Sequence, residues 1–161
     1  MKLSSKWKSI RALALSSAAG AVAAVSIALP AAAQFSKPET AVKYRQSVFT
    51  VMNNHMGRIN AQLKAASPNI QVIQNSAGVV ETMSKLPWDA FAPNTEFVSD
   101  TRALPAVFKN EAKIKELSDK MQQEAVKLNT IAKSGDVNAV RTQFGALATT
   151  CDNCHDDFRA K

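Results

Sequence analysis

Two thiols and an imidazole lie close together near the C-terminus, in the run Cys151-Asp152-Asn153-Cys154-His155. On a helix, side chains at positions i, i+3 and i+4 project from one face, so both sulfurs and the imidazole would point the same way. This is the spacing at which two cysteines attach a haem through its vinyl groups while the following histidine binds the iron. We therefore predict one haem c per chain, attached through Cys151 and Cys154, with His155 as an axial ligand of the haem iron.

Two other uses of a C-x-x-C pair fit this chain less well. A thioredoxin-like dithiol sits in a βαβ context at a helix N-terminus, which stabilises its thiolate, whereas this pair lies near the end of a chain with helical periodicity. A structural zinc site needs four ligands, and besides these residues the chain has only one more histidine, His55. His55 lies in the polar run Asn53-Asn54-His55, and we interpret it as an exposed or partly packed residue.

Residues 1–33 have the pattern of a cleaved export leader. A basic start and an Ala-rich apolar stretch precede the small residues Ala31-Ala32-Ala33, which predicts cleavage before Gln34. The apolar stretch is too weakly hydrophobic for a retained anchor, so we predict no membrane span after cleavage. Four of the 20 Lys and Arg residues lie in the leader; 16 remain against 13 Asp and Glu, giving a net charge of +3. That mixed charge argues against nucleic-acid binding, and the leader predicts a periplasmic protein.

Apolar residues recur at three- and four-residue steps in four segments, which predicts four helices within one domain at 34–161. The predicted helices run from a Ser36 cap to about 65, over 70–86, over 105–133, and from an Asp136 cap toward the C-terminus. Short connections favour antiparallel neighbours and hence an all-α, up-down-up-down four-helix bundle.

The segment 87–104 has no lasting period and contains Pro87 and Pro93, so we predict a loop. Its aromatic residues Trp88, Phe91 and Phe97 suggest that it covers something apolar.

The pattern of the first predicted helix does not decide which residue, if any, occupies the sixth coordination position of the iron. Met52 or Met56 could supply a thioether and make the iron six-coordinate and low-spin, although both residues also suit core packing. If the helix instead presents Phe49, the distal side is empty, apolar and crowded.

The sequence resembles the cytochrome c' family, the class II c-type cytochromes, over essentially the whole chain after the leader. The residues that carry the likeness are Gln34-Phe35, Ala41-Val42-Lys43-Tyr44-Arg45-Gln46-Ser47, His55-Met56-Gly57-Arg58, Leu86-Pro87-Trp88 with Phe91, Gly135-Asp136, Phe144-Gly145, and Cys151 to Arg159. Members of this family are themselves known examples of the up-down-up-down bundle.

The resemblance implies a five-coordinate, high-spin haem with no protein ligand opposite the histidine. The family's distal position, often Leu, falls on Phe49, and Met52 one turn later keeps thioether ligation open. Arg45 and Gln46 match positions that contact the haem propionates, where a guanidinium suits a carboxylate.

Two more site residues follow from the resemblance. Trp88 is expected in the wall of the pocket. Arg159 matches an arginine near the proximal face and follows His155 by four residues, which would place it one helical turn further along.

We expect a protein that binds nitric oxide, and carbon monoxide, at the distal site and can transfer electrons. The alternative is a six-coordinate, low-spin class II cytochrome that acts purely as an electron carrier. The sequence has no nucleophile–base pair, phosphate-binding loop or paired-carboxylate signature, so we predict no catalytic residues and no enzyme activity. Family members commonly form homodimers through their first two helices, and we expect the same here; redox partner proteins cannot be named from the sequence.

Overall fold

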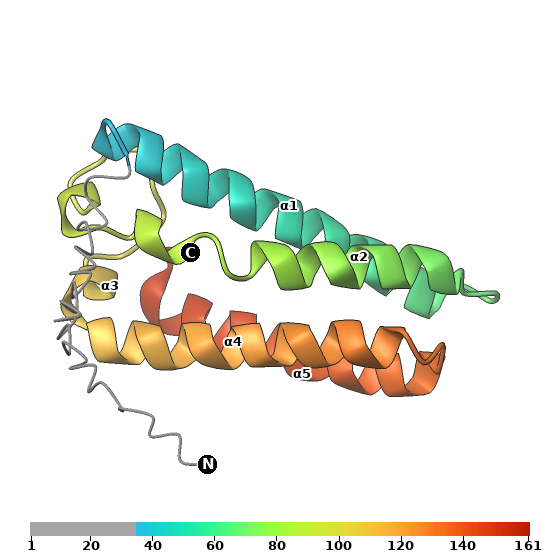
Figure 1. Cartoon of the computed structure of the whole chain (residues 1–161). Helices are drawn as coiled ribbons and strands as arrows, with labels where there is room; N and C mark the ends of the chain where they lie inside the picture. Colours follow the sequence, from blue (N-terminus) through green and yellow to red (C-terminus); the bar gives the residue numbers. More distant parts are fainter. Residues whose placement is uncertain (1–34) are drawn as a thin grey trace, which may run out of the picture.

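Four long helices and three short ones form the part of the chain that the computed structural model describes, residues 35–161 (Figure 1). The predicted leader at 1–33 lies outside the described residues. The long helices are α1 (Pro38–Lys64), α2 (Ile70–Met83), α4 (Glu111–Ala132) and α5 (Val137–Phe158). The short ones are two 3₁₀ turns, η2 (Trp88–Ala90) and η3 (Pro93–Thr95), and one helical turn, α3 (Ala106–Lys109).

The ends of the long helices follow local chemistry that the sequence carries. The carboxylate of Asp136 accepts hydrogen bonds from the amides of Asn138 (2.9 Å) and Ala139 (3.0 Å), which confirms the predicted cap of α5. Gly135 has a φ of 79° in the turn before it, a conformation that favours glycine. The predicted Ser36 cap is wrong, because α1 begins after Lys37 with no side-chain cap and has Pro38 in its first turn.

The predicted third helix is in fact two helices, because the backbone leaves the helical region at Asn110 (φ −127°, ψ 51°). The Asn110 side chain donates a 2.8 Å hydrogen bond back to the carbonyl of Ala106, so it competes with the backbone for that helical turn. The predicted second helix also ends early, at Met83, and the Ser84 hydroxyl then donates to the carbonyl of Glu81 (2.8 Å).

The core lies between the four long helices and is built from the apolar stripes that the periodicity predicted. Each long helix contributes fully buried side chains; among them are Ile59, Ile73, Leu128 and Val140. Burial of these side chains, at about 1.5–3 kcal/mol each, is the main force that holds the helices together.

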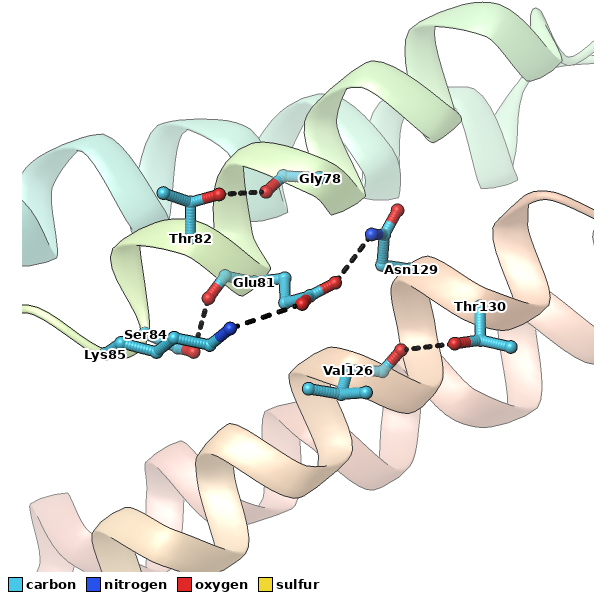
Figure 2. Close-up of polar contacts among 8 residues, drawn as sticks. All are labelled: Gly78, Glu81, Thr82, Ser84, Lys85, Val126, Asn129 and Thr130. Atoms are coloured by element: carbon cyan, nitrogen blue, oxygen red, sulfur yellow. Dashed lines mark hydrogen bonds and ion pairs between the residues drawn. The ribbon is translucent and has the colours of Figure 1, made fainter. Parts of the chain in front are cut away.

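Polar contacts fix the positions of α2 and α4 relative to each other (Figure 2). The Asn129 amide on α4 donates a 2.6 Å hydrogen bond to the Glu81 carboxylate on α2, and Lys85 lies 3.4 Å from the other carboxylate oxygen. Both contacts favour the charged carboxylate, and the Asn129 hydrogen bond is the main reason that the pKa of Glu81 is lowered.

Neighbouring helices are antiparallel, as predicted: the α1–α2 and α4–α5 turns lie at one end of the bundle, and the long loop with α3 lies at the other (Figure 1). Backbone contacts join α1 to α2, α2 to α4 and α4 to α5, with no comparable contact between α1 and α5 in residues 35–161. None of the described helices is long and apolar enough to span a membrane. The bundle is therefore least tightly closed between its first and last helices.

Candidate functional site

The C-x-x-C-H motif lies in the last two turns of α5, with its two thiols half-buried and not joined in a disulfide. Burial, the largest cause in each case, raises the pKa of Cys151 and of Cys154. The Cys151 sulfur lies 3.6 Å from the carbonyl oxygen of Leu147, one turn earlier. Both side chains are therefore neutral thiols at neutral pH, with no thiolate stabilised for redox chemistry.

The imidazole of His155 lies at the surface next to these thiols, near the end of α5. Partial burial lowers its pKa, and the positive charge of Arg159 lowers it further. Because the neutral imidazole has a free lone pair, it is the form that binds a metal ion.

Three aromatic rings from α1 and the long loop pack together. Phe49 meets Trp88 edge-on (centroids 6.1 Å apart, planes at 80°) and lies 6.3 Å from the centroid of Phe91. Trp88 and Phe91 stack at 6.1 Å, with an interplanar angle of 23°. The indole N–H of Trp88 donates to the carbonyl of Ser84 (2.7 Å), so the orientation of this ring is fixed. The predicted distal residue Phe49 thus belongs to an apolar cluster with little freedom to move.

The guanidinium of Arg45 holds the long loop against α1. It is 2% exposed and donates hydrogen bonds to the carbonyl of Ala90 (2.7 Å) and to the hydroxyls of Thr95 (2.7 Å) and Thr101 (3.1 Å). It also lies 4.5 Å from the centroid of Phe91, a cation–π distance. Burial lowers the pKa of Arg45 to about 10, so it remains charged at neutral pH. Its contact with a haem propionate stays a prediction.

Two further predicted site residues on α1 are accounted for by contacts within the protein. The Gln46 amide donates a 2.7 Å hydrogen bond to the carbonyl of Asp100 and so also ties the loop to α1. Met52 is 6% exposed and packs in the core cluster. Neither contact tests a role of these residues at a haem.

Arg159 is not part of α5, contrary to the expectation that it lies one helical turn after His155. The helix ends at Phe158, and Arg159 adopts an extended conformation (φ −125°, ψ 129°) that pairs antiparallel with Ala103. Its amide still donates to the carbonyl of His155 (3.2 Å), and its charge lowers the pKa of that imidazole. Arg159 therefore lies near His155, the predicted proximal ligand, but it is held there by pairing with the long loop, which the helical spacing did not reveal.

Two further residues contact Arg45, and neither was predicted to belong to the site. Thr95 has 0% exposure, and its hydroxyl accepts from Arg45 while donating to the carbonyl of Ala92 (2.8 Å). Phe108 of α3 provides a second ring near the Arg45 guanidinium, at 5.9 Å. A threonine in a loop has no periodicity that could mark it as buried.

Phe97, which we expected to cover something apolar, is instead 87% exposed.

A hollow of about 250 Å³ lies beside the aromatic cluster. Trp88 and Phe91 form part of its wall, and Phe108 and Ile114 add further apolar surface. Glu111 and Lys115 supply charged groups to the same wall. Neither the C-x-x-C-H motif nor Phe49 lines this hollow, so it does not mark the predicted haem site.

The residues present fit the covalent haem that the motif predicts. Two unpaired neutral thiols supply the sulfurs for thioether bonds, and the adjacent neutral imidazole of His155 suits an iron ligand. Apolar aromatic rings of α1 and the loop suit a porphyrin face. The sparse backbone contact between α1 and α5 is consistent with a flat group held between them.

Comparison with known proteins gives relatives over the same part of the chain. A family model described as Cytochrome C' matches residues 40–159. The cytochrome c' of Alcaligenes xylosoxydans xylosoxydans is 40% identical over 129 residues, which cover 80% of this chain and 99% of the relative.

Solved structures agree with the sequence comparison. A ferrous variant of cytochrome c' from Alcaligenes xylosoxidans, in which lysine replaces an arginine and NO is bound, aligns with a TM-score of 0.73 and 38% identity, covering 79% of this chain and 98% of that one. A cytochrome c' described as having an unusual ligand-controlled dimer dissociation aligns with a TM-score of 0.74 and 29% identity, covering 78% of this chain and 98% of that one.

Proposed function

Because this chain belongs to the cytochrome c' family, we propose that it takes up nitric oxide, and carbon monoxide as a second ligand, at the open face of its haem. In this proposal Cys151 and Cys154 hold the haem c by thioether bonds and His155 is the only axial ligand from the protein. The haem supplies an iron that can accept one diatomic ligand and exchange one electron. Support for the choice of gas comes from a relative that was solved with bound NO.

The observation that carries the proposal is the packing of Phe49 against Trp88 and Phe91. A phenyl ring offers no hydrogen bond, so a polar complex with dioxygen gains no stabilisation from it. The two rings packed against Phe49 resist its displacement. Such a site favours a ligand that bonds strongly to iron without help from polar side chains, as nitric oxide does.

The competing function is electron carriage by a six-coordinate iron with Met52 as the sixth ligand. Met52 is 6% exposed and packs in the core, so core packing already explains its position. We therefore favour the five-coordinate form, in which electron transfer is a further capability and not the sole activity.

Absorption spectra of the purified haem-bearing protein test the two functions against each other. We expect a high-spin spectrum in the reduced state that changes when nitric oxide is added. The substitution Met52→Leu should leave the gas-free spectrum unchanged. The substitution Phe49→Leu should speed the binding of carbon monoxide, because a smaller side chain blocks the distal face less. A sharp low-spin α-band that Met52→Leu abolishes would establish thioether ligation and refute the proposal.

Three further proposals concern the mature protein. The leader at 1–33 is removed on export to the periplasm, so the mass of the mature protein should equal that of the chain from Gln34 plus one haem.

The protein is a homodimer through α1 and α2. A relative described as having ligand-controlled dimer dissociation supports the dimer. Sedimentation of the purified protein with and without carbon monoxide tests the dimer, and a monomer at all concentrations would contradict it.

A further inference from the structure

The C-terminal residues are fastened to the long loop by a short antiparallel pairing. The amide of Leu104 donates to the carbonyl of Phe158 (2.9 Å), and the amide of Ala160 donates to the carbonyl of Arg102 (2.8 Å). The Arg102 side chain adds two hydrogen bonds to the carbonyl of Ala160, from Nε (3.0 Å) and Nη2 (2.6 Å). A planar guanidinium that grips one carbonyl with two N–H groups fixes its direction as well as its distance.

The same loop segment is fastened at its other end to α1. The carbonyl of Asp100 accepts from Gln46, and the hydroxyl of Thr101 accepts from Arg45 (3.1 Å) and from the amide of Ala103 (3.2 Å). Residues 100–104, which we call the strap, therefore connect the helix that carries the distal side of the site to the end of the helix that carries the proximal side.

The strap reaches the proximal ligand through the backbone. Arg159 pairs with Ala103 of the strap, and its amide donates to the carbonyl of His155 (3.2 Å). Phe158, between them, is buried. Movement of the last turn of α5 must therefore disturb the strap, and release of the strap frees that turn.

We propose that Arg102 is a positioning residue for the proximal side of the haem site. By gripping the carbonyl of Ala160 it holds the C-terminal residues against the strap, and so limits how far His155 can move away from the iron. The strap acts on the haem-bearing helix whichever ligand the iron takes, so its role does not depend on the proposed binding of nitric oxide.

Hydrogen exchange and resonance Raman spectroscopy on the gas-free, haem-bearing protein test this role. In Arg102→Ala we expect the amides of Leu104 and Ala160 to exchange about tenfold faster, the factor expected when roughly one hydrogen bond's worth of stability is lost. We also expect the iron–imidazole stretching band of the reduced protein to shift or broaden. Arg102→Lys keeps the charge but not the two-pronged grip, and should give intermediate values for both.

Arg141→Ala is the matched control, because Arg141 is an exposed arginine on the first turns of α5, and among the described residues its side chain makes no hydrogen bond or ion pair. It should match the unmodified protein in both measurements. Unchanged exchange in Arg102→Ala would overturn the proposal. Faster exchange with an unaltered iron–imidazole band would overturn it too, because the strap would then hold only the chain end.

Discussion

Replacement of Arg45 by methionine is the sharpest test of how the long loop is held against α1, the helix that carries the predicted distal residue Phe49. Methionine keeps a long unbranched side chain but removes the charge and every donor. The change deletes the hydrogen bonds to Ala90 (2.7 Å), Thr95 (2.7 Å) and Thr101 (3.1 Å). It also leaves the fully buried Thr95 hydroxyl without its donor.

The expected loss follows from the hydrogen bonds of a charged donor. Such bonds contribute about 1.5–3 kcal/mol each after the exchange with water is counted, and bonds that share one guanidinium are not additive. The loss in Arg45→Met should therefore be about 3 kcal/mol, the size usual when one partner of a buried charged contact is removed.

Urea unfolding of the haem-bearing protein measures this loss, followed by helical circular dichroism and by the fluorescence of Trp88. The chain has two tryptophans, and Trp7 lies in the predicted leader, so Trp88 alone should report on the loop in the mature protein. Arg58→Met is the control, because Arg58 is an exposed arginine on the same helix. A difference of less than about 1 kcal/mol between the two variants would refute the assignment of Arg45 as the residue that holds the loop.

Two other predictions concern stability. Hydrogen bonds from Lys120, Gln143 and Lys127, in order of decreasing effect, lower the pKa of Glu124 on α4 from 4.5 to about 2. The stability that this carboxylate contributes is therefore complete above about pH 4.5 and is lost as the pH falls toward 2. Urea unfolding across that range should show a shallower decline for Glu124→Gln, and parallel declines would contradict the assignment. Asn129→Leu should cost about 1–2 kcal/mol in the same assay, because the Glu81 carboxylate loses its 2.6 Å donor. Thr130→Val, a change on the exposed side of the same helix, should cost much less (Figure 2).

The sequence was sufficient for the bundle and for the haem attachment site because both depend on local patterns. Helical periodicity located the four long helices to within a few residues, apart from the break at Asn110. The C-x-x-C-H spacing predicted haem c, and the relatives confirm the family, the bundle and the cofactor. Each of these features is encoded within a few consecutive turns of chain.

Contacts between distant segments could not be predicted in this way. Arg45 and Thr95 are 50 positions apart, and Arg102 and Ala160 are 58 apart, so no window of sequence contains either pair. The resemblance to the family singled out Arg45 for a propionate, but nothing in the pattern showed that its guanidinium holds a loop. The extended conformation of Arg159 was missed for the same reason, since it depends on pairing with Ala103.

These long-range contacts bear on how the two faces of the haem site are related. Phe49, the predicted distal residue, packs against Phe91, a ring of the long loop that Arg45 contacts. The last turn of α5, which carries the predicted proximal ligand, is fastened to the same loop through Arg102. Thr101 accepts a hydrogen bond from Arg45, and its neighbour Arg102 donates to the carbonyl of Ala160 at the chain end. A displacement of α1 on one side, or of the last turn of α5 on the other, can therefore reach the opposite side through the strap. A substitution in the strap should therefore change ligand binding although the strap residue does not contact the haem. Thr101→Val tests this connection, because it keeps the side-chain shape and removes only the hydroxyl that accepts from Arg45. Its effects on the binding rate of carbon monoxide and on the iron–imidazole band should appear together; a change in one without the other would show that the two faces are held independently.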